Sequence, residues 1–329
     1  MCCLESLDSS FSNVSRTLKR TAQLTLSEDR IRRAVEAEGR TVIRCQRADA
    51  IAVSFTVDDC RDGVMVTGAD GVSVPVVPET QKAKRRRTEA ARRKASGRRS
   101  TRGPGRPKKG ADGDHREAKV LAFYNQDKSN THVLATLGDC NELGRMMRRE
   151  GRKVKLGAAK FSYSVADGAR WIKRQYQLNL PMLGANILDW YHLKEHVVEA
   201  SHAVYGELNP KAKAWQTTML DAAWDQGSLV MLHRLGPYVR RHKDECREAL
   251  TSLREYVAPR ISMTDYPSFR AAGYDCGSGP TESQCGTLTA RVKGPGMRWD
   301  SDNVESMLAL CALDHSRQWE AYWQLQRAA

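Results

Sequence analysis

Two aspartates stand directly after short apolar runs, a placement typical of residues that do chemistry in α/β folds. The runs Phe161–Ala166 and Ala185–Leu188 have the composition of strands, and a helical pattern follows each aspartate, Asp167 and Asp189. Open α/β folds usually carry their chemistry at the edge where the strands end. The sequence therefore predicts that both carboxylates lie at one edge of a sheet.

The residues after these aspartates shape the predicted edge. Gly168 allows the chain to turn sharply after Asp167. His192 follows Asp189 by three residues, a spacing that places both side chains on one face of a helix. His196 comes four residues later, but no His-Glu-x-x-His pattern marks a zinc site. We expect these imidazoles to pack or to pair, and Asp189 and His192 to form a structural hydrogen-bonded pair.

The same stretch resembles a known family. Asp-Gly-Ala-Arg-Trp-Ile at 167–172 and Leu-Asp-Trp-Tyr-His at 188–192 look like the core of a bacterial insertion-sequence DDE transposase. The most similar group is the Kra-type, which is related to the Mutator-like transposases. The resemblance covers roughly residues 50–325. It implies an α/β fold with an RNase H-like core, a metal-binding Asp, Asp, Glu triad, and an Asp-x-x-His motif after the second catalytic aspartate.

The first aspartate of the triad is expected within an Ala-Asp-Gly followed by a Val-Pro, and Asp70 with Pro75 fits that pattern. Residues 63–75 read as a strand, an Asp-Gly turn and a second strand, and Ile51–Val57 reads as another β-like run. Asp62 belongs to a second Asp-Gly pair and competes for the assignment. We favour Asp70 because it follows a predicted strand, whereas Asp62 precedes one.

The last member of the triad is predicted in the most specific match of the chain. Gly-Pro-Thr-Glu, followed by Arg-Val-Lys-Gly-Pro-Gly-Met-Arg-Trp, is nearly identical to the family pattern. Pro280 suits the first turn of a helix and so places Glu282 near the helix start. Alternatively, Glu282 is an ordinary carboxylate favoured by the helix dipole. The resemblance further suggests DNA contacts for Arg291, Lys293 and Arg298.

The predicted chemistry is metal-dependent phosphoryl transfer on DNA. Asp70, Asp167 and Glu282 would hold two Mg²⁺ (or Mn²⁺) ions, which activate the attacking oxygen and stabilise the leaving oxygen of an in-line displacement. Because 97 residues separate the two aspartates (167 − 70) and 115 residues separate Asp167 from Glu282 (282 − 167), only the tertiary fold can bring them together.

Composition agrees with a nucleic-acid partner. Lys and Arg number 53 against 39 Asp and Glu, which gives a net charge of +14 and favours nucleic acid over a membrane as the polyanionic partner. A soluble protein with one basic tail is the simpler alternative. The nine cysteines contain no CxxC pair, as expected for reduced thiols inside a cell. No apolar run reaches transmembrane length. The resemblance implies a nucleoid-associated cytoplasmic protein that binds element ends and target DNA, as a homo-oligomer.

The basic charge is concentrated in one segment. Fifteen Lys and Arg lie between Lys82 and Arg116, and large apolar residues are absent, so we expect disorder over residues 79–116. Arg-Gly-Pro-Gly-Arg-Pro-Lys-Lys at 102–109 resembles an AT-hook, whose arginine enters the minor groove of A·T-rich DNA. The DNA-binding candidates there are Arg102, Arg106, Lys108 and Lys109. A generic phosphate-binding tail is the alternative.

Six segments follow from these patterns. A helix capped at Ser27 and ending near Gly39 is expected in the N-terminal part, which is either a small DNA-binding unit or a helical packing arm. The segments are an N-terminal helical segment (1–49), the first core strands (50–78), the basic insertion (79–116), the main catalytic core (117–205), a helical insertion (206–262) and C-terminal helices of the core (263–329).

Three functions remain open at this point. The chain is an active transposase, a truncated DNA-binding remnant that cannot transpose, or an RNase H-like nuclease without joining activity. Metal-dependent cleavage separates the first from the second, and strand-transfer products separate the first from the third.

Overall fold

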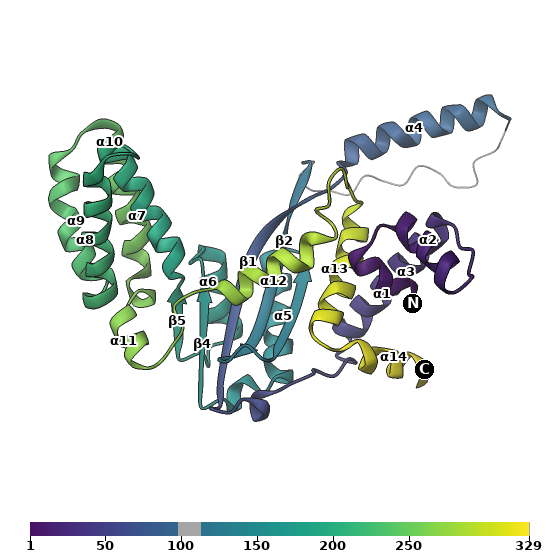
Figure 1. The fold of residues 1–329 in the computed structure, drawn as a ribbon, viewed down its shortest axis with the longest axis horizontal. Helices are drawn as coiled ribbons and strands as arrows, with labels where there is room; N and C mark the ends of the chain where they lie inside the picture. The colour runs from purple at the N-terminus through teal and green to yellow at the C-terminus, as the bar shows by residue number, and fades with distance from the viewer. Residues whose placement is uncertain (98–112, 329) are drawn as a thin grey trace.

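A mixed five-stranded sheet forms the centre of the molecule in the computed structural model, which describes residues 1–97 and 113–328 (Figure 1). The strand order is β3-β2-β1-β4-β5, with β1, β2 and β3 antiparallel and β1, β4 and β5 parallel. This arrangement, flanked by helices, is compatible with the expected RNase H-like core. The strands are β1 (Val64–Pro75), β2 (His115–Asn125), β3 (Thr131–Thr136), β4 (Phe161–Ala166) and β5 (Ala185–Leu188).

Helices cover both faces of the sheet and also lie beyond its two edge strands, β3 and β5. Helices α5 (Cys140–Lys153) and α6 (Arg170–Asn179) lie on one face, and α12 (Gly279–Ala290) crosses the other. The N-terminal helices α1 (Cys2–Asp8), α2 (Phe11–Thr21) and α3 (Glu28–Arg47) lie beside α13 (Ser301–His315) and α14 (Trp319–Ala328). Five further helices form a bundle beyond β5: α7 (Trp190–Tyr205), α8 (Pro210–Gln226), α9 (Ser228–Arg241), α10 (Asp244–Val257) and α11 (Tyr266–Ala271).

Strand β1 contributes side chains to both hydrophobic cores because successive side chains of a strand point to opposite faces. Val64 and Val66 belong to the core shared with α12 and α13. Met65 and Ala69 belong to the second core, shared with α5 and α6. By the same alternation Asp70 lies on the α12 side.

The expected strand boundaries need two corrections. Residues 63–75 do not form a strand, turn and strand, because β1 continues through Asp70-Gly71 and pairs with β2 over its whole length from Met65 to Pro75. Ile51–Val57 contains no strand. Thr56 instead caps a short 3₁₀ turn at Val57–Asp59, and the Asp59 carboxylate accepts a hydrogen bond from the Thr56 backbone N–H, a local alternative to strand pairing. Strand β3 was not expected.

Two helical predictions also change. Ser27 caps α3 as expected, but α3 continues through Gly39 to Arg47. Gly39 serves packing rather than termination, since a Cβ there would lie 2.3 Å from the backbone oxygen of Ser306 on α13. The basic segment begins with a helix, α4 (Glu79–Ala95), rather than disorder. Its Ala, Lys, Arg, Gln and Glu residues are strong helix formers.

Two local predictions are confirmed. Helix α12 begins with proline in its first turn, and residues 210–257 of the predicted helical insertion are helical almost throughout. The AT-hook-like candidates Arg102, Arg106, Lys108 and Lys109 lie outside the described residues. Among the helices that the structure describes, none combines the length and apolar character needed to span a bilayer.

Candidate active site

Three aspartates come to the same level at the carboxyl edge of the parallel strands. Thr67 of β1 pairs with Ser164 of β4, so Asp70 (70 − 67 = 3) and Asp167 (167 − 164 = 3) each lie three residues further on. Asp189 directly follows β5 and its backbone N–H donates to the Ala166 carbonyl at 2.8 Å. The parallel register, which pairs distant segments, thereby brings together residues 119 positions apart in sequence (189 − 70).

Asp70 is half-buried on β1 and faces α12. One carboxylate oxygen accepts from the Gly71 N–H at 2.6 Å, and the other accepts from the Cys285 thiol at 3.6 Å. Burial raises the pKa of the Asp70 carboxyl, and the negative charge of Asp167 adds to that rise. No Lys or Arg of the described chain is seen to form an ion pair with Asp70, and the charge of His192, which acts to lower the pKa of Asp70, does not outweigh burial.

Asp167 sits on a turn that the helical bundle holds. Its carboxylate accepts from the Ala169 N–H at 2.8 Å. The Tyr256 hydroxyl donates to the Asp167 carbonyl at 2.9 Å, and Arg260 Nε donates to the Gly168 carbonyl at 2.8 Å. Gly168 has a φ of +76°, a conformation that favours glycine. The expected sharp turn is therefore present, and two residues about 90 positions away fix it.

Close packing of α12 on β1 positions Glu282. A Cβ on Gly68 would lie 1.8 Å from Thr281 Oγ1, so glycine at this position lets the start of α12 approach the strand. Glu282 is exposed in the first turn of α12, and its carboxylate accepts from the Ser278 hydroxyl at 2.7 Å.

Asp189 and His192 link β5 to the loop before α12. The fully buried Asp189 carboxylate accepts from the backbone N–H of His192 at 2.9 Å, from His192 Nδ1 at 3.4 Å and from the Ser278 N–H. Burial acts to raise the pKa of Asp189, but the hydrogen bonds from His192 and Ser278 outweigh it and lower that pKa to about 2. The hydrogen bond to Asp189 in turn raises the pKa of His192 to about 9.

One group of potential metal ligands emerges within the described residues. Single ligand atoms of Asp189, His192 and Glu282 lie within 4.8 Å of one another, and this group includes neither Asp70 nor Asp167. The raised pKa of His192 favours its protonated form, which pairs with Asp189 beside Glu282. We therefore interpret this group as an ion-pair network. The Glu282 carboxylate lies beside Asp189 and His192.

Asp62, the competing first aspartate, lies elsewhere. It is exposed in the turn before β1, where Val64 pairs with Phe161 at the start of β4. This is the opposite end of β1 from Asp70. Of the two aspartates, Asp70 is the one at the level of Asp167.

The basic residues after α12 are placed differently from one another. Arg291 is buried, its Nε donates to the Ser6 carbonyl at 2.8 Å, and its guanidinium lies 5.1 Å and 5.0 Å from the ring centroids of Phe11 and Trp299. The expectation of a DNA contact does not fit Arg291, because a guanidinium that is already stacked and hydrogen-bonded in the interior has little surface for a phosphate. Lys293 and Arg298 are exposed, and Arg298 pairs with Asp114 at 2.7 Å.

Four positioning residues escaped the sequence analysis. No local pattern in the sequence marks Tyr256 and Arg260, because they reach Asp167 and Gly168 only through tertiary packing. Tyr256 lies at the end of α10, and Arg260 lies in the 3₁₀ turn Ala258–Met263, which packs beside β5. Ser278 and Cys285 flank Glu282 in the sequence and lie next to its Gly-Pro-Thr-Glu motif. Their small polar side chains beside Glu282 could have indicated from the sequence that they contact the predicted site.

Among solved structures, the Drosophila P element transposase strand transfer complex shows a distant similarity to this chain. The similarity spans 98% of this chain and 86% of that chain, with 13% sequence identity and a TM-score of 0.24. No protein family model matches the chain, and no curated protein is similar to it in sequence.

Proposed function

We propose that this chain is a divalent-metal-dependent phosphoryl transferase acting on DNA, of the DDE transposase type. Asp70, Asp167 and Glu282 are the proposed catalytic and metal-binding residues. The observation that carries the proposal is the matched position of Asp70 and Asp167 on adjacent parallel strands, together with the raised pKa of Asp70. Like charges held together in this way favour a bound cation.

The donor set fits Mg²⁺ or Mn²⁺. Both strand residues offer carboxylate oxygens, the ligands that hard divalent ions prefer, and Glu282 offers a third, exposed carboxylate. Glu282 is exposed and held by one serine hydroxyl, so its carboxylate is accessible to an ion. Cations bound there would supply charge stabilisation to the attacking and leaving oxygens of a DNA phosphate.

The other residues of the site position these carboxylates. Tyr256 and Arg260 fix the turn that carries Asp167, and Asp189 holds the Ser278 N–H at the entry to α12. The His192 imidazolium places positive charge beside the carboxylates of Asp167 and Glu282. Water is the nucleophile in cleavage and a DNA 3′-hydroxyl in joining, so the reaction needs no covalent bond between protein and DNA.

The test uses the purified chain with supercoiled plasmid and with duplexes taken from the DNA that flanks its gene. We expect Mg²⁺- or Mn²⁺-dependent cleavage, and joined products when a duplex with a free 3′-hydroxyl is supplied. Asp167→Asn should abolish both, because catalytic carboxylates act as a unit. Asp62→Asn, at the opposite end of β1, is the matched control and should retain activity. Cleavage that survives Asp167→Asn would overturn the proposal, and cleavage without joined products would indicate a nuclease.

A further inference from the structure

Helix α4 (Glu79–Ala95) is a surface helix with no buried residue, and it projects from the body of the molecule (Figure 1). Its 17 residues contain eight Lys and Arg against two Glu, and every residue from Lys84 to Ala95 is exposed. A helix of this composition gains nothing from packing on its own chain. Its chemistry therefore points to an external polyanion.

The base of α4 is fixed to the body. Just before the helix, Val76 and Val77 are buried, and their N–H groups donate to the carbonyls of Asp114 and Trp299 at 2.8 Å and 2.9 Å. Within the first turn, Lys82 pairs with Glu79 at 2.8 Å and with Asp300, the residue that precedes α13. These contacts set the direction in which the helix leaves the sheet.

The cations of α4 surround its axis. At about 100° per residue, the eight Lys and Arg leave no angular gap wider than roughly 80°. A flat anionic surface would contact only one side of such a helix. Binding at a membrane surface would also require an apolar face, which α4 lacks. In a groove with phosphates on both walls, by contrast, cations on several sides of the helix can each reach a phosphate.

We propose that α4 docks in the major groove of the DNA on which the protein acts. A helix with its side chains is about 10–12 Å across, and the major groove is about 12 Å wide. The charged stretch Lys84–Lys94 contains 11 residues (94 − 84 + 1) and is roughly 16 Å long, so it spans about half a turn of duplex. This inference rests on the proposed function to the extent that DNA is the substrate.

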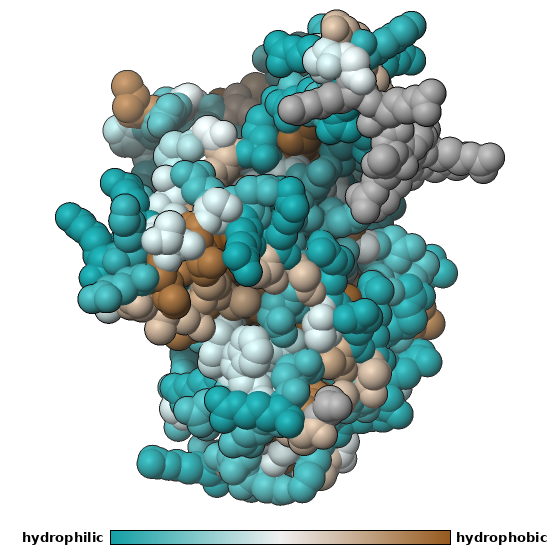
Figure 2. Space-filling model, turned by 90° about the vertical axis from the view of Figure 1, so that its right-hand side faces the viewer, coloured by the Kyte–Doolittle hydropathy of each residue, from teal (hydrophilic) through white to brown (hydrophobic). Residues whose placement is uncertain are grey.

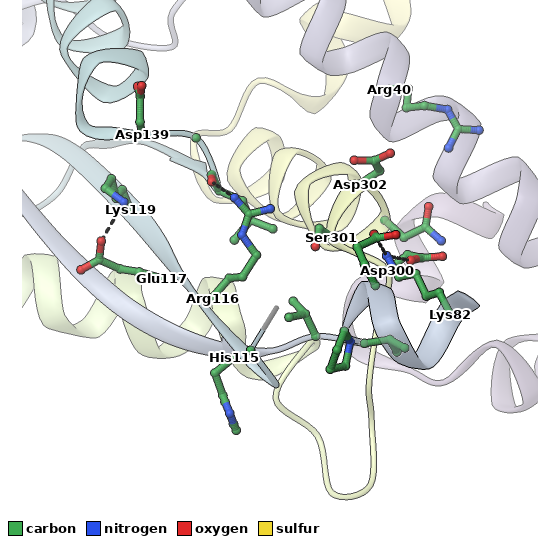
Figure 3. A pocket seen from close by; sticks show the side chains of 18 of the residues that line it. Arg40, Lys82, His115, Arg116, Glu117, Lys119, Asp139, Asp300, Ser301 and Asp302 are labelled. Carbon is green, nitrogen blue, oxygen red and sulfur yellow. Dashed lines mark hydrogen bonds and ion pairs between the residues drawn. The ribbon is translucent and has the colours of Figure 1, made fainter. Parts of the chain in front are cut away.

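A cavity lies at the base of α4 (Figure 3). It has a volume of about 710 Å³ and lies between α4, the start of β2 and the N-terminus of α13. The exposed Arg40 and Arg116 line it, and Arg116 donates to the Leu137 carbonyl at 3.0 Å. Five carboxylates line the same cavity, so it carries both signs of charge: Glu79, Glu117, Asp139, Asp300 and Asp302. The face seen in Figure 2, on the side from which α4 projects, is mainly hydrophilic.

The experiment compares two variants of equal charge change. Arg85, Arg87, Arg92 and Arg93 are replaced by Gln, which keeps helix propensity. The matched control replaces four exposed cations of α8 and α10 by Gln: Lys211, Lys213, Arg247 and Arg254. Binding to a duplex is measured by fluorescence anisotropy in EDTA over a range of salt concentrations. Circular dichroism confirms that each variant retains its helix content.

We expect the α4 variant to flatten the slope of log K against log salt by up to about 3.6, since each phosphate contact contributes about 0.9. The control should leave the slope close to that of the parent. The difference between parent and α4 variant should shrink strongly on DNA whose major groove is filled by glucosylated 5-hydroxymethylcytosine. It should persist when netropsin occupies the minor groove.

An unchanged slope would overturn the proposal, and would fit an acidic protein as the partner of α4 instead. An equal difference on glucosylated and plain DNA would overturn major-groove docking, because the cations would then contact phosphates elsewhere. The outcome is independent of catalysis. The binding is measured without metal, so a flattened slope combined with absent cleavage would retain the α4 inference and reject the proposed function.

Discussion

Asp70 and Asp167 occupy equivalent positions on two neighbouring parallel strands, each three residues beyond the paired Thr67 and Ser164. The negative charge of Asp167 reaches Asp70 and adds to the burial that raises the pKa of Asp70. The edge of the sheet therefore concentrates negative charge where no ion pair with Lys or Arg of the described chain relieves it. This relationship has a measurable effect on stability.

Asp70→Asn should stabilise the metal-free protein at neutral pH. A carboxyl whose pKa is raised in the folded state contributes stability below its unfolded pKa of about 4, and loses that contribution as the pH rises through the folded value. In EDTA the variant should melt above the parent at pH 7 and close to it at pH 3. Mg²⁺ should raise the Tm of the parent by mass action but not that of the variant. A lower Tm for Asp70→Asn at pH 7 in EDTA would contradict this account.

Asp189→Asn should reduce stability by roughly 2 kcal/mol at neutral pH, because the pKa of this carboxyl falls from 3.8 unfolded to about 2 in the fold. The stabilisation is present above pH 4 and is lost as the pH falls toward 2. Metal affinity, measured by calorimetry with Mn²⁺, should be mostly retained. If Asp189→Asn loses as much metal affinity as Asp167→Ala, then Asp189 is a ligand and our triad is misassigned.

Gly68→Ala should displace α12 and destabilise the fold by about 1–3 kcal/mol, the usual cost of overpacking. The new Cβ would lie 1.8 Å from Thr281 Oγ1. Thr281→Ala removes that atom, so the double variant should recover part of the loss in a double-mutant cycle. Gly286→Ala on the same helix meets nothing within 4 Å and should be neutral or slightly stabilising. If the effects of Gly68→Ala and Thr281→Ala on the free energy of unfolding are additive, the contact between the new Cβ and Thr281 does not cause the destabilisation.

Arg291→Ala should act on stability rather than on DNA affinity. The change leaves the Ser6 carbonyl without its donor and removes the stacking between Phe11 and Trp299, at a cost of about 1–3 kcal/mol. Lys293→Ala, at an exposed position nearby, should leave stability unchanged. Chemical denaturation and salt-dependent binding measure the two effects. If the Arg291→Ala variant is folded and the slope of log K against log salt is flattened, Arg291 contacts DNA and this account is wrong.

Glu150→Gln should weaken the acid sensitivity of the fold. Burial acts to raise the pKa of Glu150, but the hydrogen bond from His132 at 3.0 Å and the charges of His132, Lys153 and Arg149 lower it from 4.5 to about 2. The parent therefore loses roughly 3 kcal/mol as the pH falls from about 4.5 to 2. Across that range the variant should lose less stability, as measured by urea denaturation. The exposed Asp221→Asn is the control, and equal pH profiles for parent and Glu150→Gln would refute the assignment.

Local features of the chain were readable from the sequence by itself. Ser27 caps a helix because its side chain satisfies a free backbone N–H group three residues further on. Pro280 marks the first turn of α12, and Gly168 marks the turn after β4. The placement of Asp167 after a strand was also predictable, since an apolar run followed by Asp-Gly is a local signal.

The tertiary structure alone decided which distant residues meet. The register between β1 and β4 places Asp70, rather than Asp62, at the level of Asp167, and the local Asp-Gly pattern was misleading because strand pairing with β2 overrides a turn. Arg291 looked like a DNA contact in the sequence but is buried, because α2 and Trp299 close over it. Strand register and burial depend on contacts between segments far apart in the chain, and no local pattern encodes them.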